Sequence, residues 1–158
     1  MVNSSVVDLA DRYFQEGYNC AQAVLQAVAK ARGLECPKCI PGLALALGGG
    51  IGHMGKTCGA VTGGAMAIGL AVDRQMAGAP ILDKKRGAIR AAGGFVAAFE
   101  KQFGSCECAS ILGFNLAEPG STDRFQRENL KSLKCTPCVR WAAEETDRLV
   151  AGLQQGQA

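Results

Sequence analysis

Charged and aromatic residues are scarce in this sequence, and only one histidine is present. Charged residues make up 20% and aromatic residues 6% of the 158 residues, and the net charge is +3. No basic stripe is interleaved with aromatic side chains, so the composition does not indicate nucleic-acid binding. A single histidine and no evident carboxylate pair also argue against a Ser/His/Asp set or paired acid–base carboxylates.

Segments that direct a chain to or through a membrane are missing as well. The N-terminus has no basic region followed by an apolar run, so no secretory signal is expected. The uncharged stretch from Thr57 to Val72 has 16 residues and is rich in glycine, which is short for a spanning helix. We therefore expect a cytoplasmic protein without a membrane partner.

β-branched residues are sparse and alanine is abundant, which favours helix throughout the chain. Candidate caps support this, because Asn3, Asn19 and Thr57 each precede a predicted helix, and Gly33 follows one. The predicted helices cover residues 4–16, 20–32, 58–72, 82–103 and 122–131, with a short turn after Ser105 and a last helix from Pro137 to Leu153. We expect one all-α domain over residues 1–153, a bundle of about five to six helices, with a frayed tail at 154–158.

A glycine-rich segment from Gly48 to Gly55 interrupts this helical pattern. Five glycines in eight residues do not form a regular element. Residues 50–57 formally fit a phosphate-binding loop, but that motif requires a preceding strand, which the pattern does not provide. We predict instead a loop that packs tightly around Cys58 and donates N–H groups to sulfur. The residues expected to shape this site are Gly50, Gly52, His53, Gly55 and Gly59; His53 is either a surface residue or a neighbour of the sulfur site.

Most of the eight cysteines lie at predicted helix starts. Cys20 follows Asn19 and Cys58 follows Thr57. Cys106 and Cys108 follow Ser105, and Cys135 and Cys138 lie on either side of Thr136 and Pro137. A helix N-terminus carries partial positive charge and unpaired N–H groups, which favour the thiolate, the form that binds metal and attacks electrophiles. In a reducing compartment such thiols are more often ligands or redox groups than structural disulfides. We therefore expect a convergent sulfur site, although for any single cysteine an inert packing role is the alternative.

The cysteine spacings exclude some kinds of sulfur site but do not identify a single one. Two Cys-x-x-Cys pairs, Cys36/Cys39 and Cys135/Cys138, suit redox or metal chemistry, but neither precedes the histidine that covalent haem attachment needs. Zinc-finger and ferredoxin spacings are absent. Any metal ligands must therefore come from distant parts of the chain.

Four segments resemble the C_GCAxxG_C_C family, proteins of about this length to which redox activity is attributed. The segments are residues 17–24 (GYNCAQAV), 48–63 (GGGIGHMGKTCGAVTG), 103–113 (FGSCECASILG) and 135–143 (CTPCVRWAA). The resemblance implies that the family cysteines are Cys20, Cys58, Cys108 and Cys135. A similar domain occurs in split-Soret cytochromes c, with a cysteine site for an iron–sulfur cluster or disulfides; the haem motif of those proteins is missing here. The additional cysteines are Cys36, Cys39, Cys106 and Cys138, which could serve a second metal site or act as resolving thiols.

Three functional hypotheses and one alternative follow. The first is electron transfer or redox sensing by an iron–sulfur cluster on the four family cysteines, with Cys106 or Cys138 as alternates. The second is metal-free thiol–disulfide exchange at one of the Cys-x-x-Cys pairs, and the third is a structural zinc site. A scaffold without redox chemistry is the alternative. A redox protein needs a partner protein, and the smooth Gly/Ala faces also predict a homodimer.

Overall fold

The computed structural model describes residues 5–34 and 39–156, and these residues form an all-α single domain. Within these ranges there are no strands, only an isolated bridge between Thr57 and Glu107. The α-helices are α1 (Val6–Gln15), α2 (Cys20–Arg32), α3 (Ile40–Leu43), α4 (Gly59–Gln75), α5 (Ile81–Phe103), α6 (Cys108–Leu112), α7 (Ser121–Arg127) and α8 (Thr136–Gln154). A 3-10 turn at Leu45–Leu47 and a π-helical turn at Lys131–Cys135 complete them.

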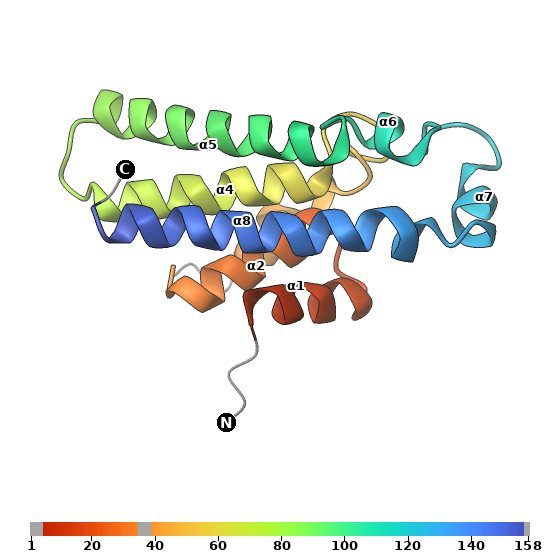
Figure 1. Ribbon diagram of the computed structural model, residues 1–158, viewed down its shortest axis with the longest axis horizontal. Coiled ribbons are helices and arrows are strands. Elements are labelled where there is room, and N and C mark those ends of the chain that lie inside the picture. The colour runs from red at the N-terminus through yellow and green to blue at the C-terminus, as the bar shows by residue number, and fades with distance from the viewer. Residues whose placement is uncertain (1–4, 35–38, 157–158) are drawn as a thin grey trace.

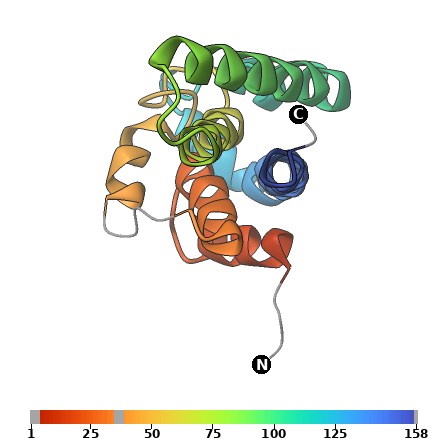
Figure 2. The same cartoon turned by 90° about the vertical axis from the view of Figure 1, so that its left-hand side faces the viewer.

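The long helices are stacked in three tiers. Figure 1 shows α5 along one side of the molecule, α4 and α8 side by side in the middle, and α2 and α1 on the opposite side. Figure 2 shows the same order from the end, with α4 and α8 between α5 and the first two helices. The short helices α6 and α7 extend the structure beyond one end of the bundle (Figure 1). That end carries most of the cysteines.

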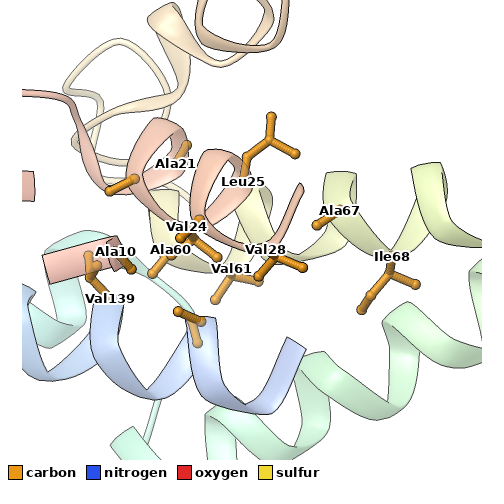
Figure 3. Close-up of a cluster of buried hydrophobic side chains, with 14 of the residues drawn as sticks. Ala10, Ala21, Val24, Leu25, Val28, Ala60, Val61, Ala67, Ile68 and Val139 are labelled. Carbon is orange, nitrogen blue, oxygen red and sulfur yellow. The ribbon is translucent and has the colours of Figure 1, made fainter. Parts of the chain in front are cut away.

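Small residues allow the middle and lower tiers to approach closely. Figure 3 shows Val24 and Val28 of α2 beside Ala60 and Val61 of α4, and all four side chains are buried. Gly63 marks the tightest point, since a Cβ built there would lie 2.4 Å from the Ala21 carbonyl oxygen. The smooth face of α4 is therefore used within the chain, and the homodimer stays a prediction that light scattering can test.

Aromatic side chains fill the space between α5 and α8. Phe95 and Phe99 are fully buried, and the ring of Trp141 lies 6.2 and 5.6 Å from theirs, centroid to centroid. The Phe95 ring occupies the hollow above Gly64, where a Cβ would lie 2.6 Å from the Phe95 Cζ atom. The glycines of α4 thus admit a backbone on one side and an aromatic ring on the other.

The predicted boundaries of α2 are confirmed. Asn19 accepts a hydrogen bond from the Gln22 backbone N–H at 2.9 Å, and the Gln22 side chain accepts one from the Asn19 N–H at 3.1 Å. This reciprocal capping box satisfies two N–H groups that have no partner within the helix. Gly33 ends the helix in the left-handed region, with φ of 60°.

Three other predicted helix starts require correction or lie outside the described residues. Cys58 itself is the N-cap of α4, because Thr57 is held in the bridge to Glu107. Likewise α6 begins after Glu107 and not after Ser105, whose side chain accepts from the Glu107 N–H at 2.9 Å. Asn3 lies outside the described residues; Ser5 caps α1.

The part of the chain that the structure describes holds eight α-helices, more than the five to six predicted. The two extra helices, α3 and α6, are a single turn each. The helix predicted over 122–131 ends at Arg127 as α7, because Asn129 adopts a positive φ of 51°. Over residues 5–34 and 39–156, no helix combines the length and apolar character that a membrane span requires.

A cavity lined by five cysteines

The cysteine-bearing end of the bundle encloses a cavity of about 220 Å³ that five thiols line. Each of four elements contributes at its start or just before it: Cys20 begins α2, Cys58 precedes α4, Cys108 begins α6, and Cys135 ends the π-helical turn. The fifth, Cys138, lies in the first turn of α8. The structure thus brings together the four cysteines that the family resemblance indicated, together with one of the additional cysteines.

The five thiols are not equally close to one another. Cys58 is central, because its thiol is hydrogen-bonded to both Cys20 and Cys138. The remaining two thiols in the cavity lining are those of Cys108 and Cys135. Among the residues with described placement, no three His, Cys, Asp or Glu side chains converge tightly enough for a single metal ion.

The remaining cavity wall is mainly apolar. Its apolar side chains are Phe14, Ile111, Leu112, Leu116 and Phe125. Among the described residues, Lys131 is the one lysine or arginine in the lining. Its Nζ donates to the Phe14 carbonyl oxygen at 2.8 Å and lies 4.7 Å from the centre of the Phe14 ring. The thiols therefore share a poorly solvated space with a single positive charge nearby.

The glycine-rich loop forms a left-handed turn against this cavity. Five consecutive residues from 49 to 53 have φ between 59° and 72°. Three of them are glycines, but Ile51 and His53 also adopt this conformation, which costs a non-glycine residue about 1–2 kcal/mol. Hydrogen bonds hold the turn, such as those from the Gly52 N–H to Ala46 at 2.8 Å and from the His53 N–H to Gly48 at 3.2 Å.

This left-handed turn supplies a hydrogen bond to sulfur, but the sulfur is that of Cys20 and not that of Cys58, around which the loop was predicted to pack. The Gly49 N–H is bonded to the Cys20 thiol, and the Ala60 N–H in the first turn of α4 is bonded to Cys58. His53 lines the cavity mouth and is exposed, and its ring packs on Gly49, where a Cβ would lie 2.3 Å from the ring.

Two other predicted glycines also shape the site. A Cβ at Gly59 would lie 2.5 Å from the Cys20 sulfur, so glycine is needed for Cys20 to sit beside Cys58. Gly55 has a φ of 69°, and a Cβ there would lie 2.8 Å from Asn115 Oδ1. Gly50 and Gly52 belong to the left-handed turn without lining the cavity.

Cys106 supports the site through its backbone, and its side chain does not line the cavity. Its carbonyl accepts from the Cys58 N–H at 2.7 Å, while the Lys56 carbonyl accepts from the Cys108 N–H, also at 2.7 Å. These two bonds join the segment before α4 to the segment before α6. The Cys106 thiol faces the other way and donates to the Val96 carbonyl at 3.7 Å.

Of the other predicted pair, the structure describes only Cys39. Cys39 is exposed and disulfide-bonded, and it does not line the cavity. Cys36 lies outside the described residues. The first Cys-x-x-Cys pair therefore contributes no described side chain to the sulfur site.

Burial and mutual contact raise the pKa of the cavity thiols. Hydrogen bonding to Cys58 and burial raise the pKa of Cys20, and hydrogen bonding to Cys138 and burial raise that of Cys58. Burial raises the pKa of Cys108 to about 11 and that of Cys135 to about 12, with added repulsion from neighbouring thiols. The backbone N–H groups of Gly49 and Ala60 lower the pKa values of Cys20 and Cys58, the direction expected of such donors, but burial and contact between the thiols outweigh this effect.

Sequence reasoning missed several residues of the site. Lys131 lies four residues before Cys135 and lowers the pKa of that thiol, although less than burial raises it. Asn19, predicted only as a cap, also donates from its side-chain amide to the carbonyls of Ala44 and Leu45 at 3.1 and 2.9 Å. It thereby fixes the start of α2 relative to the segment just before the glycine-rich loop, and no local pattern in the sequence predicts this contact.

A comparison with protein families agrees with this geometry. The family model described as "Putative redox-active protein (C_GCAxxG_C_C)" matches residues 18–149. The chain belongs to this family. No curated protein and no solved structure matches the chain. The family match spans all five cavity cysteines, and the protein is accordingly a cysteine-rich member of a redox-active family.

Proposed function

We propose that this protein transfers or senses electrons through an iron–sulfur cluster held by Cys20, Cys58, Cys108 and Cys135. The observation that carries the proposal is the shared cavity, into which four separate elements each bring one thiol. Iron–sulfur clusters are held by cysteine thiolates, commonly four. When bound, such a cluster supplies a one-electron couple.

The donor set suits a cluster better than a single ion. A tetrahedral zinc ion holds its four sulfurs at about 2.3 Å from the metal, which requires them to converge tightly. The described side chains show no such group of three, whereas a cluster of several irons spaces its ligands more widely around a central volume. The cavity of about 220 Å³ between the thiols provides this volume.

The surrounding residues would tune the site. The backbone N–H groups of Gly49 and Ala60 are bonded to the sulfurs of Cys20 and Cys58 and would stabilise negative charge there. Phe14 and the other apolar residues exclude water, and Lys131 adds one positive charge. Hydrogen bonds, charge and solvent exclusion are the main means by which a protein sets a cluster potential.

Anaerobic purification tests this proposal directly. We expect brown protein that contains iron and acid-labile sulfide and shows charge-transfer absorption. Cys58→Ser should remove most of the iron, because Cys58 is the central thiol. Cys106→Ser is the matched control: it is also buried, but its side chain lies outside the cavity, so its iron content should be unchanged. Folded, anaerobic protein that lacks iron, or that holds only zinc, would contradict the proposal.

A second candidate function is metal-free thiol–disulfide chemistry, which one observation favours. The Cys58 thiol contacts both Cys20 and Cys138, so a disulfide could form with either and then exchange. In this step two thiols lose two electrons and two protons to a disulfide of a partner protein, whose two sulfurs become thiols.

Thiol counting distinguishes the two functions. If exchange is the function, the metal-free protein should lose two free thiols on treatment with an oxidised dithiol and regain them with a reduced one. Cys58→Ser should abolish this change, while Cys106→Ser should not. An unchanged thiol count in folded protein would exclude this second function.

A further inference from the structure

A second, larger groove lies away from the cysteine cavity, at the other end of the three long helices. Its volume is about 880 Å³, within the range of small-ligand sites, which is about 300–1,000 Å³. It lies between the first half of α5 and the last turns of α8, with the end of α4 as its floor. Figure 2 views the molecule from this end and shows α5 and α8 separated there.

Glycine keeps this groove open. Gly152 of α8 lines it, and a Cβ built there would meet nothing within 4 Å. Gly87 lines the opposite wall, where a Cβ would make only ordinary contacts of 3.5 Å with Val72 and Met76. Neither residue has a positive φ, so glycine is not required by the backbone at either place. The absent side chains leave space that larger residues could occupy without strain.

The groove combines an apolar floor with a basic rim. Val72, Met76, Leu149 and Leu153 provide the apolar surface. The arginines of the rim are Arg86 and Arg90 on α5 and Arg148 on α8.

Two of these arginines are already paired. Arg86 lies 3.4 Å from Asp83, which also lines the groove, and Arg148 donates to Glu145 at 2.8 Å. Arg90 makes no hydrogen bond or ion pair with any residue in the described ranges. Its guanidinium is thus the free cation of the rim, with donors suited to a carboxylate or a phosphate.

We propose that this groove binds a small amphipathic anion, with its head on Arg90 and its apolar body across Val72, Met76 and Leu149. The proposal follows from the free guanidinium beside an unfilled apolar floor. It does not depend on the cysteine cavity, and its outcome is independent of whether a cluster is bound.

Calorimetric titration of the full-length protein tests this site. Dodecanoate and dodecyl phosphate, both below their micelle concentrations, distinguish a carboxylate head from a phosphate head. At least one should bind saturably with one site per chain. Dodecyltrimethylammonium, which has the same tail and the opposite charge, should bind at least about tenfold more weakly, as should inorganic phosphate, which lacks the tail.

Two pairs of variants locate the site. Arg90→Gln should weaken binding about tenfold or more, whereas Lys85→Gln removes the same charge from α5 outside the groove and should leave binding unchanged. Gly152→Leu should abolish binding by filling the groove, whereas Gly94→Leu, at an exposed helical position also open to solvent, should not.

Several results would overturn the proposal. Equal binding of the cationic and anionic amphiphiles would show that charge plays no part. Unchanged binding in Gly152→Leu, with circular dichroism confirming the fold, would place the amphiphile elsewhere. Saturable binding of neither anion to the folded protein would show that the groove does not take this class of ligand.

Discussion

The cysteine-bearing end and the middle of this molecule differ in side-chain packing and in backbone conformation. In the middle, straight helices interlock, with the Gly63–Ala21 approach on one side and the Phe95–Trp141 contact on the other. At the cysteine end the backbone turns left-handed, α8 begins with a π-helical turn, and a cavity of about 220 Å³ remains unfilled. The middle of the bundle is densely packed, whereas the cysteine-bearing end keeps a cavity.

The two regions therefore contribute differently to the stability of the fold. Filled cores stabilise, whereas cavities and residues forced to positive φ destabilise and persist where the surrounding structure holds them. Here the packed middle holds the ends of α2, α4 and α8 in place while their thiols line open space. Substitutions in the packed middle should therefore change stability without changing the cysteine cavity.

Alkaline pH should weaken the cysteine end most. In the reduced, metal-free protein the pKa values of Cys108 and Cys135 are raised to about 11 and 12, and those of Cys20 and Cys58 are raised as well. The unfolded chain releases these protons near pH 8.5 while the folded chain keeps them, so stability falls as pH rises from about 8.5 towards 12. Each thiol contributes at most about 1.4 kcal/mol per pH unit to this loss.

Urea unfolding at pH 8, 9 and 10 measures this slope. The double variant Cys108→Ala/Cys135→Ala should show a shallower decline than the parent, because two of the responsible protons are gone. A free energy of unfolding that stays constant to pH 10 in the reduced parent would contradict the prediction.

Phe95→Ala should cause the largest loss among single substitutions in the packed middle. The side chain is fully buried between Gly64 and Trp141, so its removal leaves a cavity, with a cost of about 3–5 kcal/mol. Urea unfolding at pH 7 checks this value. In whatever fraction remains folded, iron content per folded chain should match the parent, since Phe95 does not line the cysteine cavity.

Gly63→Ala should cost about 1–3 kcal/mol, because the added methyl group would lie 2.4 Å from a backbone oxygen that cannot rotate away. Chemical denaturation measures the loss. A neutral result would mean that α2 and α4 can separate without penalty, which the close packing of Figure 3 argues against.

Gly94→Ala makes the same substitution as Gly63→Ala at an exposed helical position, and it should have the smallest effect on stability. Gly94 is an exposed position within α5 where a Cβ meets nothing within 4 Å, and its φ is not positive. Replacing glycine by alanine inside a helix should therefore stabilise the protein, by about 0.5–1 kcal/mol. Destabilisation would indicate that this face of α5 is covered in solution, for example by a second copy of the chain.

Much of the fold could be predicted because its signals are local. The capping box at Asn19 and the left-handed Gly33 follow from residue types at a single helix end. The cap of α4 could not be predicted in this way, because Thr57 is taken by a bridge to Glu107, fifty residues away in sequence. Long-range pairing of this kind overrides a local preference and leaves no local trace.

Which cysteines lie near one another could be predicted from the sequence better than how the backbone arranges them. The three-residue spacing of Cys135 and Cys138 places both on one side of the helical segment that the π-helical turn and α8 form, and both line the cavity. Cys106 and Cys108 have an equally suggestive spacing, yet the segment between them is extended at the bridge, and only Cys108 faces the cavity. The left-handed turn at 49–53 was equally hidden, since Ile51 and His53 seldom adopt positive φ.

The Asn19 side chain, which binds the carbonyls of Ala44 and Leu45, has a bearing on how the protein matures in the cell. Asn19 and both of these partners precede Cys135 in the sequence and are therefore synthesised before it. The cavity can close only after Cys135 and Cys138 have left the ribosome, because both line it. Any inserted cofactor would therefore have to arrive after that point, and the thiols made earlier would have to be kept reduced until then.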